Sequence, residues 1–186
     1  MTDEELLSAA RAVFQREGHA GSTRAIAKAA GVSQAVLFQR FGSKEQLFFA
    51  AMIPEAPDID GVLGAPSEDA RRYLEEVVGR LLRHFRALMP AVLQLSAHPA
   101  FDVAHLDEAH RHLLAERLHR GLADRLRTLR HRGEVADAPC DAMATTIIAV
   151  VHSLVVHEVL VGSPATESRA SAMVDILWRG IRPERG

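Results

Sequence analysis

Two glutamines, Gln34 and Gln39, lie in a short segment whose other residues are mostly small or apolar. A primary amide can donate and accept a hydrogen bond at once, so it can pair bidentately with the edge of an adenine. The neighbouring Ala35, Val36 and Phe38 offer apolar groups that can contact a thymine methyl. This combination of residue types is suited to reading base edges in the major groove of DNA.

Such side chains must be carried on a helix that is held outward, and the flanking residues predict one. Gly31 ends a preceding helix, because glycine adopts the left-handed conformation at a helix end without a Cβ penalty. Ser33 is placed to cap the next helix, over residues 34–40. Leu37 and Phe41 lie four residues apart and give this helix an inner face.

The supporting helices are predicted from caps and apolar spacing. Thr23 is expected to cap the helix before the turn, and Ser43 is expected to cap the helix that begins at Lys44. Thr2 and Glu5 form a capping box for a bracing helix at the start of the chain. The inward positions predicted for the bracing helix and for the helix before the turn are Leu6, Ala10, Val13, Phe14, Ile26, Ala27 and Ala30.

The span from Leu6 to Met52 resembles the DNA-binding domain of the TetR family of one-component transcriptional regulators. Three pieces carry the resemblance, in order and with the expected gaps: AARAVFQREG, STRAIAKAAGVS and LFQRFGSKEQLF. The alternative is that three short amphipathic helices merely form a compact bundle. That alternative does not account for an outward face of small and amide side chains.

The resemblance implies a set of DNA contacts. Phosphate contacts are expected from Thr23, Ser33, Gln39 and Lys44, and Arg40 either contacts a phosphate or complements the helix dipole. The full expected DNA-binding set is Thr23, Ser33, Gln34, Ala35, Val36, Phe38, Gln39, Arg40 and Lys44. The sequence departs from the family at Phe38 and Gln39, where tyrosine is common, at Arg40, where histidine is common, and in the absence of a basic N-terminal arm. The net charge is only −2, so DNA binding must depend on local contacts.

The rest of the chain is predicted to be helical, which makes the fold class all-α. Residues 1–52 are expected to form the DNA-binding domain, 53–66 a proline-rich and glycine-rich boundary, and 67–186 an effector-binding and dimerisation domain. Helices are expected from Ser67 to an interruption at Pro90, and over 91–96, 103–131, 139–161 and 164–181.

The last two predicted helices suggest a homodimer. Residues 143–161 are apolar on almost every side, and a helix of that kind must be covered all round. We expect these two helices to pair with their copies in a four-helix interface, the alternative being that both are covered within one chain. His152 and His157 lie in this apolar stretch, either hydrogen-bonded in the core or interface or lining a ligand cavity.

The resemblance also implies a small-molecule effector that shifts the separation of the two reading heads. The residues suggested for its pocket are Phe85, Met89, Phe101, His152 and Trp178, and each can equally be plain core. Their aromatic and soft apolar surface favours a mainly apolar effector.

Other functional classes have weaker support. Cys140 is the single cysteine, which excludes an internal disulfide and fits a cytoplasmic protein; the acidic start TDEE is unlike a secretory signal. The apolar run 147–161 is expected to be too short to span a bilayer. His105, His110 and His112 lie near acidic residues, but their spacing is poor for a metal site, so no metal or cofactor is expected. No nucleophile and base occur at catalytic spacing, so an enzyme is not expected.

The sequence therefore predicts a ligand-responsive transcriptional repressor that binds a partly palindromic operator in double-stranded DNA as a homodimer, with no membrane partner. A ligand-insensitive DNA-binding regulator would carry the same motif without a cavity. A helical metal-binding protein or an enzyme would need the histidines to converge.

Overall fold

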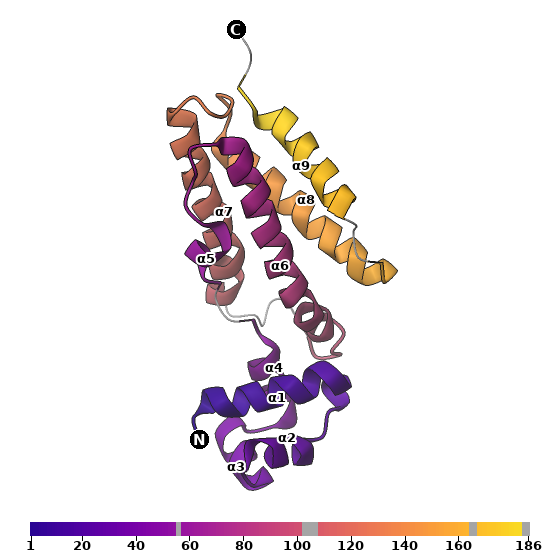
Figure 1. The fold of residues 1–186 in the computed structure, drawn as a ribbon. Coiled ribbons are helices and arrows are strands. Elements are labelled where there is room, and N and C mark those ends of the chain that lie inside the picture. Colours follow the sequence, from indigo (N-terminus) through magenta and orange to yellow (C-terminus); the bar gives the residue numbers. More distant parts are fainter. Residues whose placement is uncertain (55–56, 102–107, 164–166, 184–186) are drawn as a thin grey trace. The chain divides into compact units, whose positions relative to one another are not determined.

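The computed structural model describes residues 1–54, 57–101, 108–163 and 167–183, with the side chains of 108–115 and 167–168 excepted. The described residues form helices and no strand, which confirms the all-α prediction. The helices are α1 (Asp3–Glu17), η1 (Gly18–Ala20), α2 (Thr23–Ala30), α3 (Gln34–Phe41), α4 (Lys44–Met52), α5 (Ile59–Leu63), α6 (Ala70–Ser96), α7 (Glu108–His131), α8 (Cys140–Val161) and α9 (Glu167–Ile181) (Figure 1).

The chain divides into two compact units. The first, termed the head, comprises Met1–Glu55 and Pro90–His105, and the second, termed the body, comprises Ala56–Met89 and Leu106–Gly186. The C-terminal turns of α6 therefore belong to the head, in addition to the residues 1–52 expected there. The division falls within α6, at Pro90.

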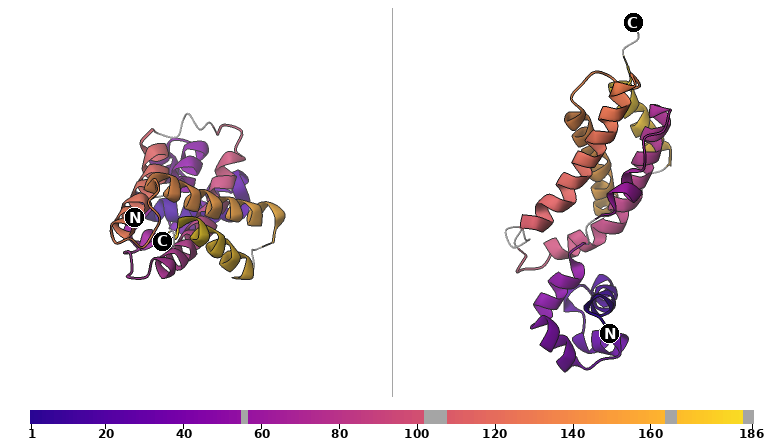
Figure 2. Two further views of the ribbon diagram at one scale, coloured as in Figure 1. Left: turned by 90° about the horizontal axis from the view of Figure 1, so that it is seen from above. Right: turned by 90° about the vertical axis from the view of Figure 1, so that its left-hand side faces the viewer.

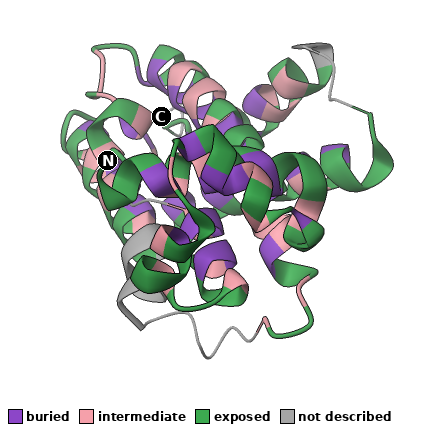
Figure 3. Ribbon diagram, turned by 90° about the horizontal axis from the view of Figure 1, so that it is seen from below, coloured by how far each residue is buried: buried purple, intermediate pink, exposed green. Residues whose placement is uncertain are grey.

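The head is built around α1, which packs on α2 and α4. All seven predicted inward positions of α1 and α2 are buried, as the spacing of apolar residues requires. The rings of Phe14 and Phe48 meet edge to face at 5.0 Å between centroids. A Cβ atom at Gly21 would lie 2.9 Å from the Phe14 ring, so glycine allows the chain to pass closely over it. Figure 3 shows buried and exposed segments alternating along the helices, the mark of amphipathic packing.

Two predicted helix starts are corrected by one or a few residues. The N-cap of α2 is Ser22, whose hydroxyl accepts from the backbone N–H of Ala25, and Thr23 is the first helical residue. The start of α6 is capped by Asp69, which accepts from the N–H of Arg72 at 3.1 Å, instead of by Ser67. Several short polar side chains compete at each start, and local spacing alone does not rank them.

Pro90 does not interrupt its helix, contrary to expectation. Helix α6 is continuous from Ala70 to Ser96 with Pro90 inside it. Proline removes one backbone hydrogen bond. The flanking Met89, Ala91 and Leu95 are all buried, and we attribute the continuity of the helix to this packing.

The body consists of α5, α6 as far as Met89, and α7 to α9, with α7 packed along α8 (Figure 2). Its core is rich in leucine and valine, and it also encloses Tyr73. Arg86 on α6 makes a bidentate ion pair with Glu158 on α8, at 2.8 and 2.9 Å. Glu158 is the one charged residue in the buried class among those that the structure describes. Arg71 on α6 and Asp175 on α9 make a further ion pair at 2.6 Å.

Helix α8 is 22 residues long and is long and apolar enough, by length and composition alone, to cross a membrane; 33% of its most apolar window is buried. The apolar run 147–161 is thus part of the helix predicted over 139–161, which the structure gives as Cys140–Val161. His152 and His157 are exposed within the single chain, so of the alternatives weighed for them the core of their own chain drops out, and a dimer interface or a ligand cavity stay open. The exposed large apolar residues of the body are Val150, Val159, Leu160, Val161 and Ile176.

Candidate nucleic-acid interface

Helix α3 is positioned by its two ends and by one buried side chain. Gly31 ends α2 in the left-handed conformation, with φ 67°, and Ser33 caps α3 by accepting from the N–H of Val36 at 3.3 Å. Leu37 is completely buried and fastens the helix to the core of the head. Ala35 and Phe38 point outward, with 40% of Phe38 exposed. A short helix with one anchored face therefore leaves its other face free for a ligand.

The two glutamines are both exposed, but they differ in what holds them. Gln34 donates from Nε2 to the hydroxyl of Thr23 at 2.8 Å, a contact between α3 and the start of α2. This bond fixes the amide and leaves its Oε1 available as an acceptor. Gln39 lies on the exposed side of the same helix. Thr23 and Gln34, which the sequence suggested for different roles, are thus joined by a hydrogen bond.

Arg40 is held by the start of α1. It donates to Asp3 Oδ1 at 2.9 Å and to the carbonyl oxygen of Met1 at 3.1 Å. The sequence analysis did not anticipate Asp3 as a partner, because 37 residues separate the two and no motif links them. A phosphate that approaches Arg40 must compete with this carboxylate.

The remaining expected residues stand at helix starts. Ser33 precedes α3 and Lys44 is the first residue of α4, where backbone N–H groups are free of helical partners. Ser33 is exposed, while Lys44 and Val36 are partly buried. Helix N-termini of this kind suit a phosphate oxygen. Ser22, at the start of α2, is an additional candidate, signalled only by its position before Thr23.

An anchored helix after a tight turn, with exposed amide and small apolar side chains, defines a helix-turn-helix DNA-binding protein. Residues 6–51 match the family model described as bacterial regulatory proteins, tetR family. Residues 6–51 therefore form a DNA-binding domain of the TetR type, and the protein is a DNA-binding regulator and not an enzyme.

Solved structures agree with the fold along the whole chain. A putative TetR-family transcriptional regulator from Mesorhizobium loti aligns with a TM-score of 0.69 at 22% identity, over 97% of this chain and 96% of that one. The flavonoid-responsive regulator FrrA aligns with a TM-score of 0.64 at 24% identity, over 98% and 97%. Salmonella enterica GusR aligns with a TM-score of 0.64 at 21% identity, over 95% and 93%. No curated protein matches the chain.

The residues suggested for an effector pocket are divided between the two units. Phe101 belongs to the head and packs against its core, whereas Phe85 and Met89 are buried in the body. Phe85 and His152 do meet, edge to face at 5.3 Å between ring centroids. Trp178 is partly buried on α9.

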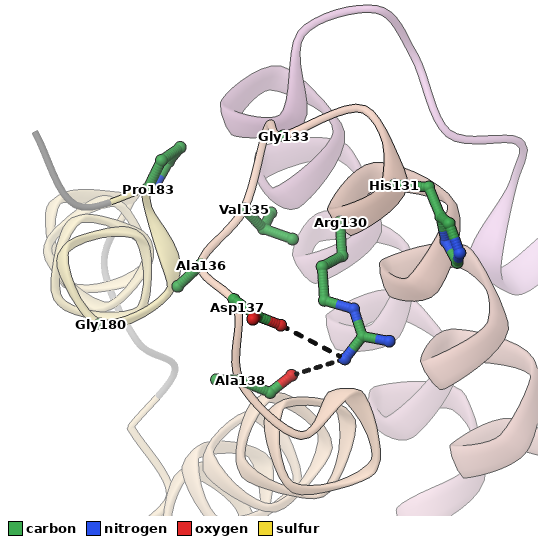
Figure 4. Close-up of a pocket in the computed structure, with 9 residues that line it drawn as sticks. All are labelled: Arg130, His131, Gly133, Val135, Ala136, Asp137, Ala138, Gly180 and Pro183. Carbon is green, nitrogen blue, oxygen red and sulfur yellow. Dashed lines mark hydrogen bonds and ion pairs between the residues drawn. The ribbon is translucent and has the colours of Figure 1, made fainter. Parts of the chain in front are cut away.

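Two described surface pockets in the body contain none of these five residues. One, of about 740 Å³, lies between the end of α7, the following loop and the end of α9. Arg130 in this pocket is directed at Asp137 and the carbonyl oxygen of Ala138, so its guanidinium group already has acceptors within the chain (Figure 4). The other is an open apolar groove of about 450 Å³ between α8 and α9, with His157 and Arg169 among its lining residues.

The candidate metal ligands fall largely outside the described part of the chain. His105 lies outside the described residues, and so do the side chains of His110 and His112. Among the residues whose positions the structure gives, no group of three or more histidine, cysteine, aspartate or glutamate side chains is arranged to hold a metal ion. Cys140 is a buried free thiol.

Proposed function

We propose that the protein is a ligand-responsive repressor that binds a palindromic operator as a homodimer in the cytoplasm. The observation that carries the proposal is the anchoring of α3, with Leu37 fully buried and Gln34 and Gln39 exposed on the same helix. A recognition helix needs this combination, because base readout requires side chains held in a fixed register.

Base readout is assigned to Gln34 and Gln39, with Ala35, Val36 and Phe38 beside them. Thr23 presets the Gln34 amide, so Oε1 accepts from the amino group of a base, while Ser33, Lys44 and Arg40 contact phosphates.

The test is an operator selected from random duplexes with the purified protein. Replacing Gln34 and Gln39 together by alanine should remove about 1–3 kcal/mol for each lost base contact and abolish discrimination between operator and random DNA. Gln15→Ala, which removes an exposed glutamine from α1, is the matched control. Unchanged discrimination in the double variant would refute the assignment of the reading helix.

The homodimer is supported by uncovered apolar surface on α8 and α9. Leu160 and Ile176 are 72% and 70% exposed in the single chain, and the groove between the two helices is mainly apolar. Monomeric proteins rarely leave such a surface open. A two-fold dimer covers it with its own copy and allows two recognition helices to reach half-sites roughly 34–36 Å apart.

An effector is supported by the names of structurally similar proteins. FrrA is named a flavonoid-responsive regulator, and another structural neighbour is described in connection with the control of antibiotic production by bacterial hormones. The body, with its mostly apolar core, suits a mainly apolar effector whose binding weakens operator affinity. A coupling free energy of about 1–3 kcal/mol is sufficient for this. Operator affinity that no ligand changes would leave a constitutive DNA-binding regulator instead.

A further inference from the structure

Residues 59–64, which comprise α5 and the glycine after it and are termed the strap, are held against α6 and α7 by two arginines. Arg80 on α6 donates from Nη2 to the carbonyl oxygen of Leu63 at 3.0 Å. Arg125 on α7 donates from Nε to the carbonyl oxygen of Gly64. Both guanidinium groups are well covered, with 23% and 16% of the side chains exposed. The strap thus supplies backbone acceptors to two largely buried cations.

The strap fits this position through two glycines. A Cβ atom at Gly64 would lie 2.6 Å from Nη2 of Arg80, so the guanidinium packs directly on the backbone. A Cβ atom at Gly121 would lie 2.9 Å from Ile59 and 3.0 Å from Leu63. If the strap moved, it would uncover the two cations and an apolar surface at Gly121 together.

Tyr73 lies near the two arginines, and its polar group is not satisfied. It is 1% exposed, and its hydroxyl has no hydrogen-bond partner among the described residues. Burial raises the pKa of Tyr73 to about 12, and the nearby charges of Arg125 and Arg80 oppose that rise only in part. The Nε of Arg80 is likewise buried without a described partner. A buried unsatisfied polar group costs about 1–3 kcal/mol, so this cluster has unused donor capacity.

Two carboxylates, one of them on the strap itself, pair with the arginines from the solvent side. Asp60 accepts from Arg125 at 2.7 Å but is itself 93% exposed, and the nearest oxygen of Glu76 is 3.6 Å from Arg80. Neutral backbone carbonyls are weaker partners for a guanidinium than a carboxylate is. A buried carboxylate is therefore a stronger partner for the two guanidinium groups than the strap's backbone carbonyls and its solvent-exposed Asp60 carboxylate.

We propose that Arg80, Arg125 and the Tyr73 hydroxyl form the anchor site for a carboxylate, and that an apolar effector with a carboxylate end binds there by displacing the strap. The inference rests on the proposed ligand responsiveness and names the chemical class of the effector. The apolar part of the ligand takes the surface that Ile59 and Leu63 leave at Gly121. The strap follows α4 in the sequence, and we expect its displacement to change operator affinity.

Tyr73 is the only tyrosine in the chain, which gives a direct reporter. Protein that carries 3-fluorotyrosine has one ¹⁹F resonance from this site, and it is titrated with carboxylates from acetate to octanoate and with benzoate at constant ionic strength. A saturable shift is expected with the longer carboxylates, and none with the matched amides such as hexanamide. No saturable shift with any of these acids, or an equal shift with the amides, would overturn the site.

Variants separate binding at this site from general charge effects. Arg80→Gln and Arg125→Gln should each weaken octanoate binding about tenfold or more, as the loss of a charge-assisted hydrogen bond predicts. Arg83→Gln, which removes an exposed arginine from the same helix, should bind octanoate like the unaltered protein. Equal weakening in all three variants would contradict the proposal.

Tyr73→Phe keeps the test valid if the arginine variants fold poorly. Because the hydroxyl has no described partner, its removal should leave the unliganded melting temperature unchanged or higher while reducing the stabilisation by octanoate. A lower melting temperature with full octanoate stabilisation would show a purely structural role and overturn the site. Operator binding is measured separately: octanoate binding without any change in operator affinity would uphold the carboxylate site and reject its regulatory role.

Discussion

The head and the body differ in how fully they cover their apolar side chains. In the head, the helices cover one another's apolar faces, and Phe38 on the reading helix is its one exposed large apolar side chain among the described residues apart from Met1. In the body, Leu160 and Ile176 on α8 and α9 are mostly exposed. The difference teaches that the head is complete as a rigid support, whereas the body needs a further surface to finish its packing.

The polar contacts of the two units differ in the same way. In the head, Arg40 and Asp3 pair at the surface, where an ion pair contributes little and can be exchanged for a phosphate. In the body, Glu158 is buried against Arg86, and the Tyr73 hydroxyl is buried with no described partner. Buried polar groups are sensitive to what is placed beside them, because the low local dielectric strengthens each gain or loss. We therefore expect the body to respond to ligands more strongly than the head.

The largest expected effect tests how tightly the core of the head is packed. Phe14→Ala removes a fully buried ring that meets Phe48 edge to face, and it should cost about 3–5 kcal/mol in unfolding free energy. Urea denaturation of the full chain measures it, with Phe38→Ala as the exposed control. Similar losses in both variants would contradict the division of α1 and α3 into core and reading faces.

The next largest effect tests whether the exposed apolar face of the body is a dimer interface. Ile176→Glu places a charge on the exposed apolar face of α9 and should raise the dimer dissociation constant about 100-fold, which corresponds to roughly 3 kcal/mol. Sedimentation velocity over a concentration series measures the constant. Ala87→Glu, at an exposed position on α6, should leave the dimer intact. If both variants remain equally dimeric, the face on α9 is not the interface.

A smaller effect follows from the raised pKa of Tyr73. The unfolded chain loses the phenol proton near pH 10 while the folded chain keeps it until about pH 12, so the folded state becomes less favoured as the pH rises through this range. The loss should total about 2 kcal/mol in the unaltered protein relative to Tyr73→Phe. Denaturant unfolding of both proteins between pH 9 and pH 12 checks this, and parallel curves would show that the phenol is not desolvated.

The smallest effect concerns the surface ion pair of the head. Asp3→Asn should free Arg40 for phosphate contact and raise operator affinity about two- to fivefold, with a slightly steeper salt dependence. Fluorescence anisotropy with the selected operator measures it, and Glu4→Gln is the control that removes one exposed negative charge without touching Arg40. Equal gains in both variants would mean that only net charge matters.

The helix-turn-helix of the head was predictable because helix caps, glycine stops and apolar spacing involve residues that are close in the sequence. The cap at Ser33, the stop at Gly31 and the inner position of Leu37 all fall within seven residues, and the structure has each as expected. The error at Thr23 has a tertiary cause, since Ser22 supplies the cap and the Thr23 hydroxyl accepts from Gln34, eleven residues away.

The body was predictable only as a set of helices. Pro90 was expected to break α6, but the helix continues where Met89 and Ala91 are buried. The sequence left open whether His152 and His157 lie in the core, at an interface or in a cavity, because the side of an almost uniformly apolar helix that faces its own chain depends on the neighbouring helices. The five residues suggested for a pocket fall in two units for a similar reason, because apolar residue types do not specify which of two cores they join.

By itself, the sequence determined the all-α class, the helix-turn-helix and the outward glutamines, because capping, glycine stops and apolar periodicity are properties of neighbouring residues. Only the tertiary structure decided that Asp3 holds Arg40 and that Arg80 and Arg125 hold the strap beside Tyr73. Those contacts join residues up to 65 positions apart, and no local pattern encodes them, since they arise from how whole helices are placed against one another.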